Sequence, residues 1–292
     1  MSKRKGIIMA GGAGTRLYPI TIGISKQLLP IYDKPMIYYP LSVLMLSDIR
    51  EIAIITTPED QEQFFTILGD GRQWGLSFTY IEQPSPDGLA QAYTLAENFL
   101  AGAPSSMVLG DNIFYGHRFQ EALESAQGQE TGGTVFGYQV LDPEHYGVVE
   151  LGQNGKVISI IEKPEIPASN YVVTGLYFLD GSAVDRARDI TPSARGELEI
   201  TTLLQSYMKD DLLSVEVLGR GFAWLDTGTH ANLLEAGEFI RTLQTRQGLQ
   251  LGCPEEIAFR KGWISADALE KRVSLFSQNN YGKYLQSLLE QS

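Results

Sequence analysis

The sequence predicts an α/β protein with a Rossmann-like, mixed but mostly parallel central sheet flanked by helices. Two observations support this class. From residue 5 to about residue 110, short β-branched runs that end at polar turns alternate with stretches of helical spacing, and this alternation is typical of βαβ units. Residues 133–179 then carry shorter strand patterns separated by turn signals, which favour further strands added to the same sheet.

The first half predicts buried strands and covering helices in turn. The expected strands are 6–10, 51–58, 76–82 and 106–110, and the expected helices are 37–47, 61–68 and 89–100. The run Glu-Ile-Ala-Ile-Ile-Thr-Thr-Pro at 51–58 is typical of a strand buried on both faces. Ligands of such sheets bind beyond the carboxyl ends of the strands, so polar residues that follow these strands are candidates for a site.

The second half predicts shorter strands and then helices. The expected strands are 133–139, 147–151, 156–162, 171–179, 213–218 and 221–225, and the expected helices are 182–189, 198–208 and 230–247. Asn154-Gly155 is a strong hairpin signal between two of these strands. No proline-rich or charged linker divides the chain, which favours one continuous domain, and residues 254–259, 264–269 and 281–289 predict a small helical extension.

Composition limits the kinds of partner. The chain of 292 residues is 43% hydrophobic and 20% charged, enough to bury a substantial core. The net charge of −12 argues against nucleic-acid and anionic-membrane partners, because both require basic surface. Cys253 is the single cysteine, which excludes an internal disulfide and is consistent with a cytoplasmic protein. The apolar run near the N-terminus, about five residues, is too short for a signal or membrane segment.

The stretch that follows the first strand predicts a phosphate-binding loop. It supplies glycines, a hydroxyl and two cations, namely Gly11, Gly12, Gly14, Thr15, Arg16 and Lys26. Glycines let backbone N–H groups approach phosphate oxygens, and the cations add charge where an oligophosphate would lie. A dinucleotide fingerprint fails because Leu17 stands where its third glycine would be, and a Walker loop fails because Thr15-Arg16 follows Gly14. An ordinary glycine turn after a strand is the alternative.

Two segments, GGAGTRLYPIT at 11–21 and SKQLLPIYDKPMIYYPL at 25–41, resemble the signature of bacterial sugar-1-phosphate nucleotidyltransferases, most closely their glucose-1-phosphate thymidylyltransferases. The resemblance runs nearly end to end. It implies the nucleotidyltransferase fold in a domain 1–247, with a nucleotide-binding part at about 1–130, a sugar-binding part at about 131–228 and a helical extension at 248–292. The implied reaction joins dTTP and α-D-glucose-1-phosphate into dTDP-glucose and pyrophosphate, the first step of dTDP-rhamnose-type deoxysugar nucleotide synthesis.

The resemblance also implies which residues form the site. It assigns catalysis to Arg16, Lys26 and Lys163, nucleotide binding to Gly11, Gly12, Gly14, Thr15, Arg16, Gln83 and Gly88, sugar-phosphate binding to Tyr146, Gly147, Glu162, Lys163, Val173, Tyr177 and Arg195, and Mg²⁺ to Asp111 and Asp226. The Gln83 amide offers a donor and an acceptor to the imide edge of thymine or uracil. A hard cation that prefers one or two carboxylates with phosphate oxygens suits the two aspartates.

Each of these residues, taken alone, has an ordinary structural explanation. Aspartates at strand ends often cap helices, Glu162-Lys163 reads as a solvated strand end, and His145 reads as an exposed loop histidine and not a general base. Relatives commonly continue Ile-Thr-Asp where this chain has Ile200-Thr201-Thr202, which puts any role of that aspartate in doubt.

Alternative functions within the same fold are a uridylyl- or adenylyltransferase, an enzyme for another hexose, or a sensor of sugar nucleotides. An NAD-dependent oxidoreductase fails on the missing third glycine. The resemblance further implies a homotetramer and feedback inhibition by a dTDP-sugar at a second site between subunits.

Overall fold

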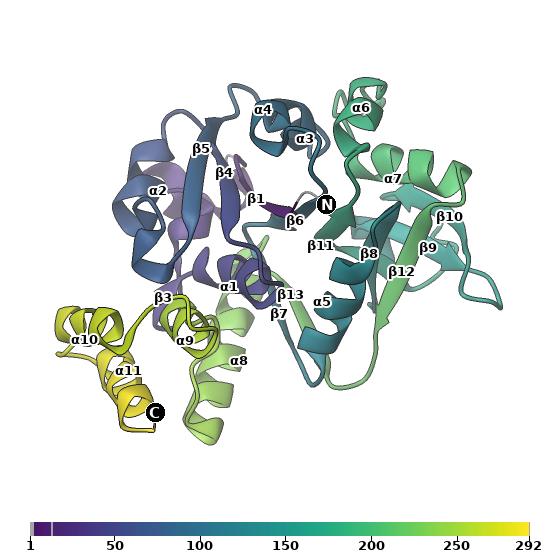
Figure 1. Ribbon diagram of the computed structural model, residues 1–292. Coiled ribbons are helices and arrows are strands. Elements are labelled where there is room, and N and C mark those ends of the chain that lie inside the picture. The colour runs from purple at the N-terminus through teal and green to yellow at the C-terminus, as the bar shows by residue number, and fades with distance from the viewer. Residues whose placement is uncertain (1–2, 13, 292) are drawn as a thin grey trace.

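A nine-stranded mixed sheet runs through the computed structural model, which describes residues 3–12 and 14–291. Its main path is β10-β9-β11-β6-β1-β4-β5, and β8 joins β11 to β12 (Figure 1). The strands are β1 (Lys5–Ala10), β4 (Glu51–Thr56), β5 (Ser77–Glu82), β6 (Ser105–Leu109), β8 (Gly133–Gln139), β9 (Gly147–Leu151), β10 (Val157–Glu162), β11 (Tyr171–Leu179) and β12 (Leu213–Leu218). The predicted α/β class with a mixed sheet is confirmed.

The first half of the sheet is parallel. Strand β1 pairs with β4 and β6, and β4 pairs with β5, so Ile8 lies opposite Ile54 and Val108. The side chains of Ile8, Ile54 and Val108 are fully buried because helices cover both faces of the sheet. The carboxyl ends of β1 and β6 therefore lie side by side, and the loops that follow them meet at one edge of the sheet.

The second half is largely antiparallel. Strand β11 pairs antiparallel with β6, β8 and β9, whereas β12 pairs parallel with β8. The predicted hairpin between β9 and β10 is present, and Gly155 at its turn has a φ of 77°, which a glycine adopts without strain. Since β11 is hydrogen-bonded to β6, the two halves share one sheet.

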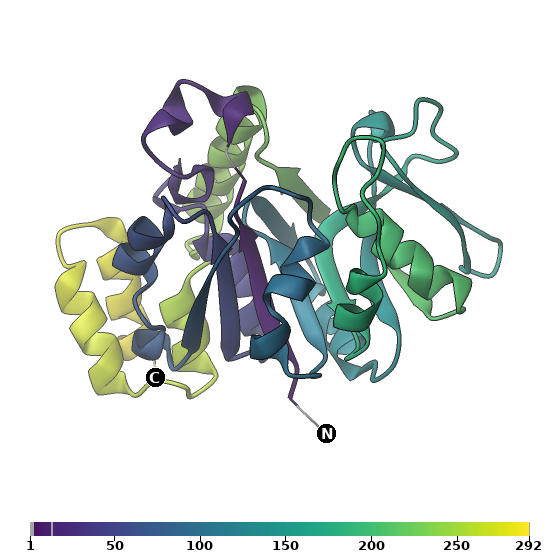
Figure 2. The same cartoon turned by 90° about the horizontal axis from the view of Figure 1, so that it is seen from above.

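Helices form a layer on each face of the sheet (Figure 2). The face that carries Ile8 and Ile54 packs against α1 (Tyr38–Leu46), α2 (Gln61–Leu68), α5 (Phe119–Gly128) and α9 (Pro254–Arg260). The face that carries Ile7 and Met9 packs against α3 (Gln91–Leu95), α4 (Glu97–Leu100), α6 (Ala183–Arg188) and α7 (Ile200–Lys209). Alternate residues of β1 thus pack against the helix layers on opposite faces of the sheet, as the two-residue period of a strand requires.

Two sequence-based expectations are wrong in detail. The strand expected at 221–225 exists as β13 (Phe222–Asp226), but it leaves the main sheet and pairs antiparallel with β7 (Asn112–Gly116), an element that the sequence reading missed together with α5. The single helix expected at 89–100 is two helices, α3 and α4, which meet at Ala96. The β7–β13 ribbon matters most because β13 ends at Asp226 and β7 begins directly after Asp111, the two residues of the predicted metal site.

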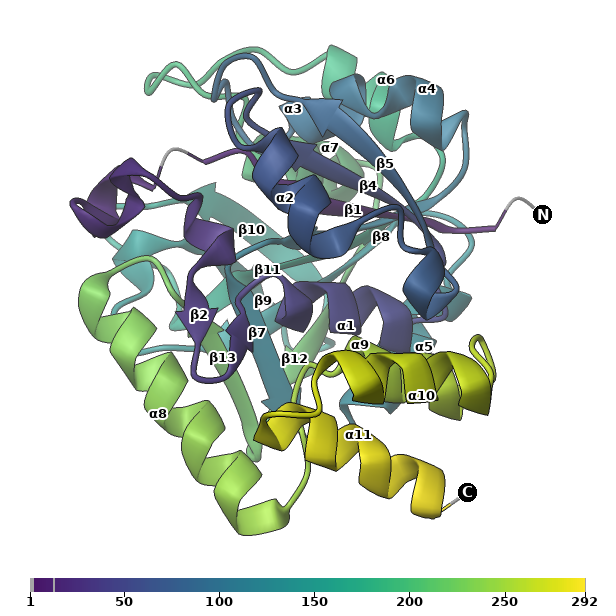
Figure 3. The ribbon, with the colours of Figure 1, turned by 90° about the vertical axis from the view of Figure 1, so that its left-hand side faces the viewer.

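The remaining elements lie along one side of the molecule (Figure 3). Helix α8 (His230–Gln247) contacts the hairpin of β2 (Pro30–Ile31) and β3 (Lys34–Pro35) and also contacts β13. Helices α10 (Ala266–Leu275) and α11 (Asn280–Glu290) enclose a small core with α9, where the fully buried Glu255 accepts from Arg272 at 2.8 Å and from Tyr281 at 2.5 Å. Within the described residues, no helix is both long and apolar enough to cross a membrane.

Candidate active site

The loop after β1 is shaped by its glycines. Gly14 has a left-handed φ of 62°, begins the short helical turn Thr15–Leu17, and accepts a hydrogen bond from the Thr21 hydroxyl at 2.7 Å. A Cβ on Gly14 would lie 3.2 Å from Thr21 Cγ2, so both the φ value and the space favour glycine. Leu17 is fully buried and fixes the turn, which leaves Arg16 exposed. Ala13 of the predicted loop lies outside the described residues.

Lys26 turns away from solvent and pairs with Asp111. Its side chain is only 7% exposed, and its ammonium group donates a hydrogen bond to Asp111 Oδ2. Burial by itself would raise the pKa of Asp111, but the charge and hydrogen bond of Lys26 outweigh burial and hold that pKa below its ordinary value. Asp111 therefore stays ionised, as a metal ligand must.

The β7–β13 ribbon brings Asp111 and Asp226 together. Asn112 lies opposite Asp226 in the register, and Asp111 immediately precedes Asn112. Thr227 then closes the end of the ribbon by donating its hydroxyl to the Asp111 carbonyl at 2.9 Å. Burial and repulsion from the Asp111 carboxylate raise the pKa of Asp226. Two mutually repelling carboxylates are a donor set that a divalent cation would stabilise, so the chemistry of these residues fits Mg²⁺.

Asn112 orients this pair and was not among the predicted site residues. Its amide nitrogen donates to Asp111 Oδ1 at 2.9 Å, and its amide oxygen accepts from Trp224 Nε1 at 2.6 Å and from the Gly175 N–H at 3.1 Å. These bonds join β7, β13 and β11 at one buried point. A sequence signal was present, since Asn112 directly follows Asp111, but its partners lie far along the chain.

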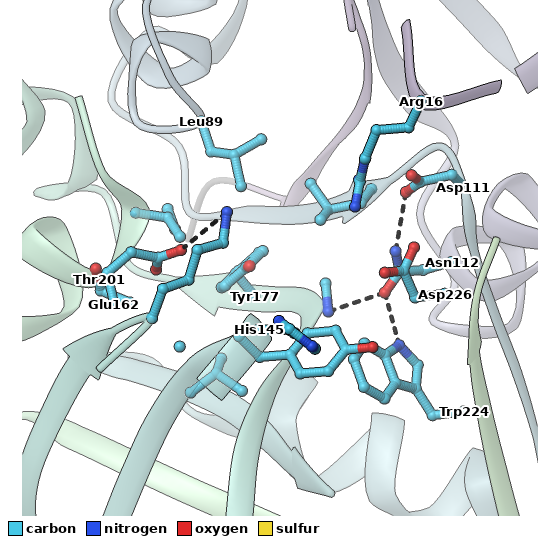
Figure 4. A pocket seen from close by; sticks show the side chains of 17 residues that line it. Arg16, Leu89, Asp111, Asn112, His145, Glu162, Tyr177, Thr201, Trp224 and Asp226 are labelled. Carbon is cyan, nitrogen blue, oxygen red and sulfur yellow. Dashed lines mark hydrogen bonds and ion pairs between the residues drawn. The ribbon is translucent and has the colours of Figure 1, made fainter. Parts of the chain in front are cut away.

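A cavity of about 440 Å³ opens beside the two aspartates. Nine predicted residues line it: Arg16, Asp111, Tyr146, Gly147, Glu162, Lys163, Val173, Tyr177 and Asp226. Figure 4 shows Asp111, Asn112, Asp226 and Trp224 on one side of this cavity and Glu162 and Thr201 on the other. The cavity also includes His145, exposed as the sequence predicted, and Leu89, Leu109, Gly175 and Ile200.

A second cavity, of about 170 Å³, lies over the glycine loop. Six predicted residues line it, namely Gly12, Gly14, Thr15, Arg16, Lys26 and Asp111, together with Leu17, Gln27 and Gly228. Arg16 and Asp111 line both cavities, so the two spaces adjoin at these side chains. Gly228 lies close to both groups, since a Cβ there would lie 3.0 Å from the Arg16 guanidinium and 3.1 Å from Asp226 Oδ1.

Charged groups surround the far end of the larger cavity. Burial and the nearby Glu199 raise the pKa of Glu162, against the attraction of Lys163 and Arg195. Lys163 Nζ lies 3.9 Å and Arg195 NH1 lies 3.8 Å from Glu162 Oε1. Burial raises the pKa of Tyr146 to about 12, which keeps its hydroxyl protonated at neutral pH. This end can therefore offer carboxylate acceptors, a phenol donor and two cations to a polar ligand.

Four predicted residues line neither cavity, and each is engaged nearby. They are Gly11, Gln83, Gly88 and Arg195. Gln83 is 3% exposed and donates to Gln91 Oε1 at 2.7 Å, and a Cβ on Gly11 would come within 2.0 Å of its amide oxygen. Gly88 packs against the backbone of Leu198, and Arg195 pairs with Glu197 at 2.8 Å. These residues border the cavities without facing them.

Thr201 is a second residue that the sequence reading did not assign. It is 3% exposed, is the second residue of α7 and lines the larger cavity, and a Cβ on Gly147 would come within 2.8 Å of its methyl group. Its neighbour Thr202, where relatives commonly have aspartate, is half-buried and lines neither cavity. Of these two threonines, Thr201 is therefore the one that contributes to the cavity wall.

Comparisons with known proteins agree with this geometry. The family model for nucleotidyl transferases matches residues 5–242. A glucose-1-phosphate thymidylyltransferase of Xanthomonas campestris pv. campestris is 62% identical over 99% of this chain and 98% of its own length, and one of Mycobacterium tuberculosis is 52% identical over 99% and 100%.

Solved structures give the same result. A Bacillus anthracis protein described as a glucose-1-phosphate thymidylyltransferase, crystallised with a sucrose, superposes with a TM-score of 0.76 at 42% identity over 82% of this chain and 95% of its own. A UDP-glucose pyrophosphorylase in complex with UDP-glucose superposes with a TM-score of 0.72 at 25% identity over 82% and 99%. The chain therefore belongs to the nucleotidyl transferase family, within its glucose-1-phosphate thymidylyltransferases.

Proposed function

We propose that this chain transfers a thymidylyl group from dTTP to α-D-glucose-1-phosphate, giving dTDP-glucose and pyrophosphate, and that it thereby begins dTDP-rhamnose-type nucleotide synthesis. The observation that carries the proposal is the junction of the two cavities at Arg16 and Asp111. One cavity is lined by glycines and cations that suit a triphosphate, and the other is lined by the carboxylate, phenol and lysine that suit a sugar phosphate. A ligand in each would meet at the shared residues.

The reaction needs no activated side-chain nucleophile. An ionised phosphate oxygen of glucose-1-phosphate forms a bond to the α-phosphorus of dTTP, and the bond from that phosphorus to the bridging oxygen of the β-phosphate breaks. Catalysis then consists of alignment and of charge neutralisation between two polyanions. This chemistry requires no Ser-His or Cys-His pair, and His145 needs no role as a base.

Different cations would bind the phosphates of the two substrates. Arg16 would bind the β- and γ-phosphates above the loop of Gly11, Gly12, Gly14 and Thr15. Lys26 carries three N–H donors, so it can keep Asp111 while donating to the leaving pyrophosphate. On the opposite side, Lys163 and Arg195 would bind the incoming sugar phosphate. The repulsion that opposes approach of the two substrates is thereby screened from both ends.

We assign Mg²⁺ to Asp111 and Asp226, which would supply two carboxylate oxygens while substrate phosphates and water complete the shell. When bound there, Mg²⁺ would add positive charge beside the phosphorus under attack. Among the described residues no cluster of three or more His, Cys, Asp or Glu side chains could hold a metal.

Substrate selection would involve both ends of the site. Tyr146, Gly147, Glu162, Val173 and Tyr177 line the sugar cavity and would bind hydroxyl groups of glucose, while Gln83 and Gly88 would meet the pyrimidine base. Because Gln83 is buried and bonded to Gln91, its amide must turn or shift to reach the imide edge. This arrangement favours dTTP or UTP over purine triphosphates.

The test is pyrophosphate release from dTTP, UTP, ATP, GTP and CTP, each with glucose-1-phosphate and Mg²⁺. We expect turnover with dTTP, weaker turnover with UTP and little with the rest, and we expect chelation of Mg²⁺ to stop the reaction. Turnover without preference for dTTP or UTP would contradict the base assignment, and tight sugar-nucleotide binding without turnover would favour a sensor. Other hexose-1-phosphates in the same assay define the sugar specificity.

Regulation and assembly extend the same proposal. A cavity of about 790 Å³, away from the two described above, is lined by Tyr115, His117, Arg118, Gln250 and Arg260 among others, and this mixture of cations and aromatic rings suits a dTDP-sugar as a feedback inhibitor. We also propose a homotetramer that acts in the cytoplasm, where the buried thiol of Cys253 would stay reduced. Gel filtration with and without dTDP-rhamnose, and inhibition by it, test assembly and regulation.

A further inference from the structure

We propose that the main-chain contact between Gly88 and Leu198 couples the nucleotide site to the sugar-phosphate site, so that a bound base fixes the loop that carries Arg195. The inference rests on the proposed function. It concerns two segments: the base segment, residues 83–91, and the sugar-phosphate loop, residues 192–201.

The two segments are joined by backbone bonds. The Leu198 N–H donates to the Asp87 carbonyl at 2.6 Å, and the Ala90 N–H donates to the Leu198 carbonyl at 3.0 Å. Gly88 lies between these bonds with a φ of 119°, and a Cβ there would lie 2.4 Å from Leu198 O and 2.5 Å from Leu198 N. Gly88 therefore has to be glycine because the backbone of Leu198 occupies the space beside it.

A chain of side-chain hydrogen bonds connects the base-reading amide to this junction. Gln83 Nε2 donates to Gln91 Oε1 at 2.7 Å, and Gln91 Nε2 donates to Asp87 Oδ2 at 2.8 Å. Asp87 also accepts from the Ser85 hydroxyl at 2.6 Å, and its carbonyl receives the Leu198 N–H. A base that draws the Gln83 amide into a new position thus acts on the bonds that set the position of Leu198.

The sugar-phosphate loop continues directly from Leu198 to groups around the sugar cavity. Glu199 is 7% exposed, accepts from the Ser193 hydroxyl at 2.9 Å and lies 3.7 Å from Arg195 Nε. Ile200 and Thr201 follow and line the cavity, and Leu89 of the base segment lines it too. A shift at Leu198 therefore moves both the Arg195 pairing and the cavity wall.

The consequence is a coupling of the two binding equilibria. If the base stabilises the junction in the arrangement that receives sugar phosphate, dTTP tightens glucose-1-phosphate binding, and glucose-1-phosphate tightens dTTP by the same factor. Leu198 is a positioning residue because it touches neither substrate, whereas Gly88 also meets the base. Substitution at either residue should reduce the coupling and raise the KM for glucose-1-phosphate, and substitution of Gly88 should raise the KM for dTTP as well.

The experiment measures the Kd of glucose-1-phosphate by calorimetry, alone and with the α,β-methylene analogue of dTTP, which cannot release pyrophosphate. We expect the analogue to tighten binding by about fivefold or more in the unmodified protein. Inorganic tripolyphosphate fills the phosphate loop but has no base, so it should give no tightening. Gly88→Ala should reduce the tightening to below about twofold, because its Cβ pushes the base segment away from Leu198.

A second variant and a matched control keep the result interpretable. Ala90→Pro suits the native φ of −68° and removes the N–H that donates to the Leu198 carbonyl, so it should weaken the coupling without the clash at residue 88. Gly155→Ala carries the same kind of positive-φ strain, with a φ of 77°, but a Cβ there meets nothing within 4 Å. Gly155→Ala should therefore lower the stability of the fold but leave the coupling between the two substrates unchanged.

Three outcomes would overturn the inference: a protein that turns over dTTP but shows no tightening, full coupling in both Gly88→Ala and Ala90→Pro, or full tightening by tripolyphosphate. Circular dichroism and the Gly155→Ala variant separate loss of coupling from loss of fold. A protein that releases no pyrophosphate from dTTP and glucose-1-phosphate would instead refute the proposed function, so the two failures are distinct.

Discussion

The phosphate loop and the aspartate pair illustrate two ways of building one site. The loop is local: Gly14 and Thr21, which bond at 2.7 Å, are seven residues apart in the chain. The aspartate pair is assembled from distant segments, because the bond that joins its two halves runs from Thr227 to Asp111, 116 residues apart. The local part depends on backbone conformation, whereas the assembled part depends on strand pairing and burial. The two should therefore respond differently to substitution.

The largest effect is expected at the assembled part. Asp226→Asn should lower kcat/KM by on the order of 10³-fold, because one of two metal-binding carboxylates is lost. The same change should raise stability. The fold raises the pKa of Asp226, so the folded state holds the proton more tightly than the unfolded chain does and the ionised carboxylate destabilises the fold at neutral pH. Asparagine removes that charge, so the temperature of thermal unfolding should rise.

The matched control is Asp211→Asn, an exposed aspartate that pairs with Lys156 at 2.8 Å on the surface. It should leave turnover unchanged and alter stability by no more than a few tenths of a kcal/mol. Asp226→Asn with normal turnover would remove residue 226 from the metal site, and a lowered unfolding temperature would show that Asp226 is retained for the fold.

Two threonines, Thr227 and Thr21, allow the assembled aspartate pair to be compared directly with the local phosphate loop. Thr227→Val removes the hydroxyl that bonds Asp111 O in a fully buried position, which leaves that carbonyl with only the longer Thr227 N–H contact of 3.3 Å. We expect a loss of about 1–2 kcal/mol in the free energy of unfolding, measured by urea titration at constant m. The displaced aspartates should also reduce kcat.

Thr21→Val is the local counterpart. It removes a bond of similar length, but Gly14 O keeps its hydrogen bond from the Leu17 N–H at 2.9 Å. The loss should therefore stay below about 1 kcal/mol. Equal losses in the two variants would mean that distance along the chain and burial do not separate the two parts of the site.

What the sequence could predict follows the same division. Helix α2 at Gln61–Leu68, strand β11 at Tyr171–Leu179 and helix α8 at His230–Gln247 match the expected bounds, because each carries a sustained period or a run between clear stops. The phosphate-binding loop could also be predicted, because its glycines and cations lie close together in the sequence. The two aspartates could be linked only through resemblance to a family, since no local pattern states that β13 leaves the main sheet to pair with β7.

Other features could not be predicted from the sequence, for physical reasons. β7 is a five-residue run whose Ile113 and Phe114 face different cores, so it shows no alternation of polar and apolar residues. Asn112 and Thr201 act through partners that only the fold supplies. Gln83 was assigned to the base through the family resemblance, with which its amide chemistry agrees, but its burial against Gly11 and Gln91 is a tertiary property. The link between Gly88 and Leu198 joins segments that no spacing rule relates.

The smallest expected effect concerns the sugar-binding end of the larger cavity, where, in addition to burial, the charge of Glu199 raises the pKa of Glu162. Burial and Glu199 raise the pKa of Glu162, and Glu162 accepts hydrogen bonds from sugar hydroxyls most strongly, and at both oxygens, when it is ionised. As pH falls through that raised pKa, Glu162 gains a proton and the KM for glucose-1-phosphate should rise. Glu199→Gln removes the repelling charge, lowers the pKa of Glu162 and moves this acid limb to lower pH, with a few-fold lower KM at mildly acidic pH.

Glu197→Gln is the control, since Glu197 also pairs with Arg195 but its side chain is 43% exposed against 9% for Glu199, so water screens its charge. Ionisation of the substrate phosphate is common to all variants and cancels in the comparison. An acid limb that moves equally in both variants would show that loss of an Arg195 partner controls the sugar end. A limb that moves only in Glu199→Gln would show that an assembled, buried charge pair sets the pH range of the site.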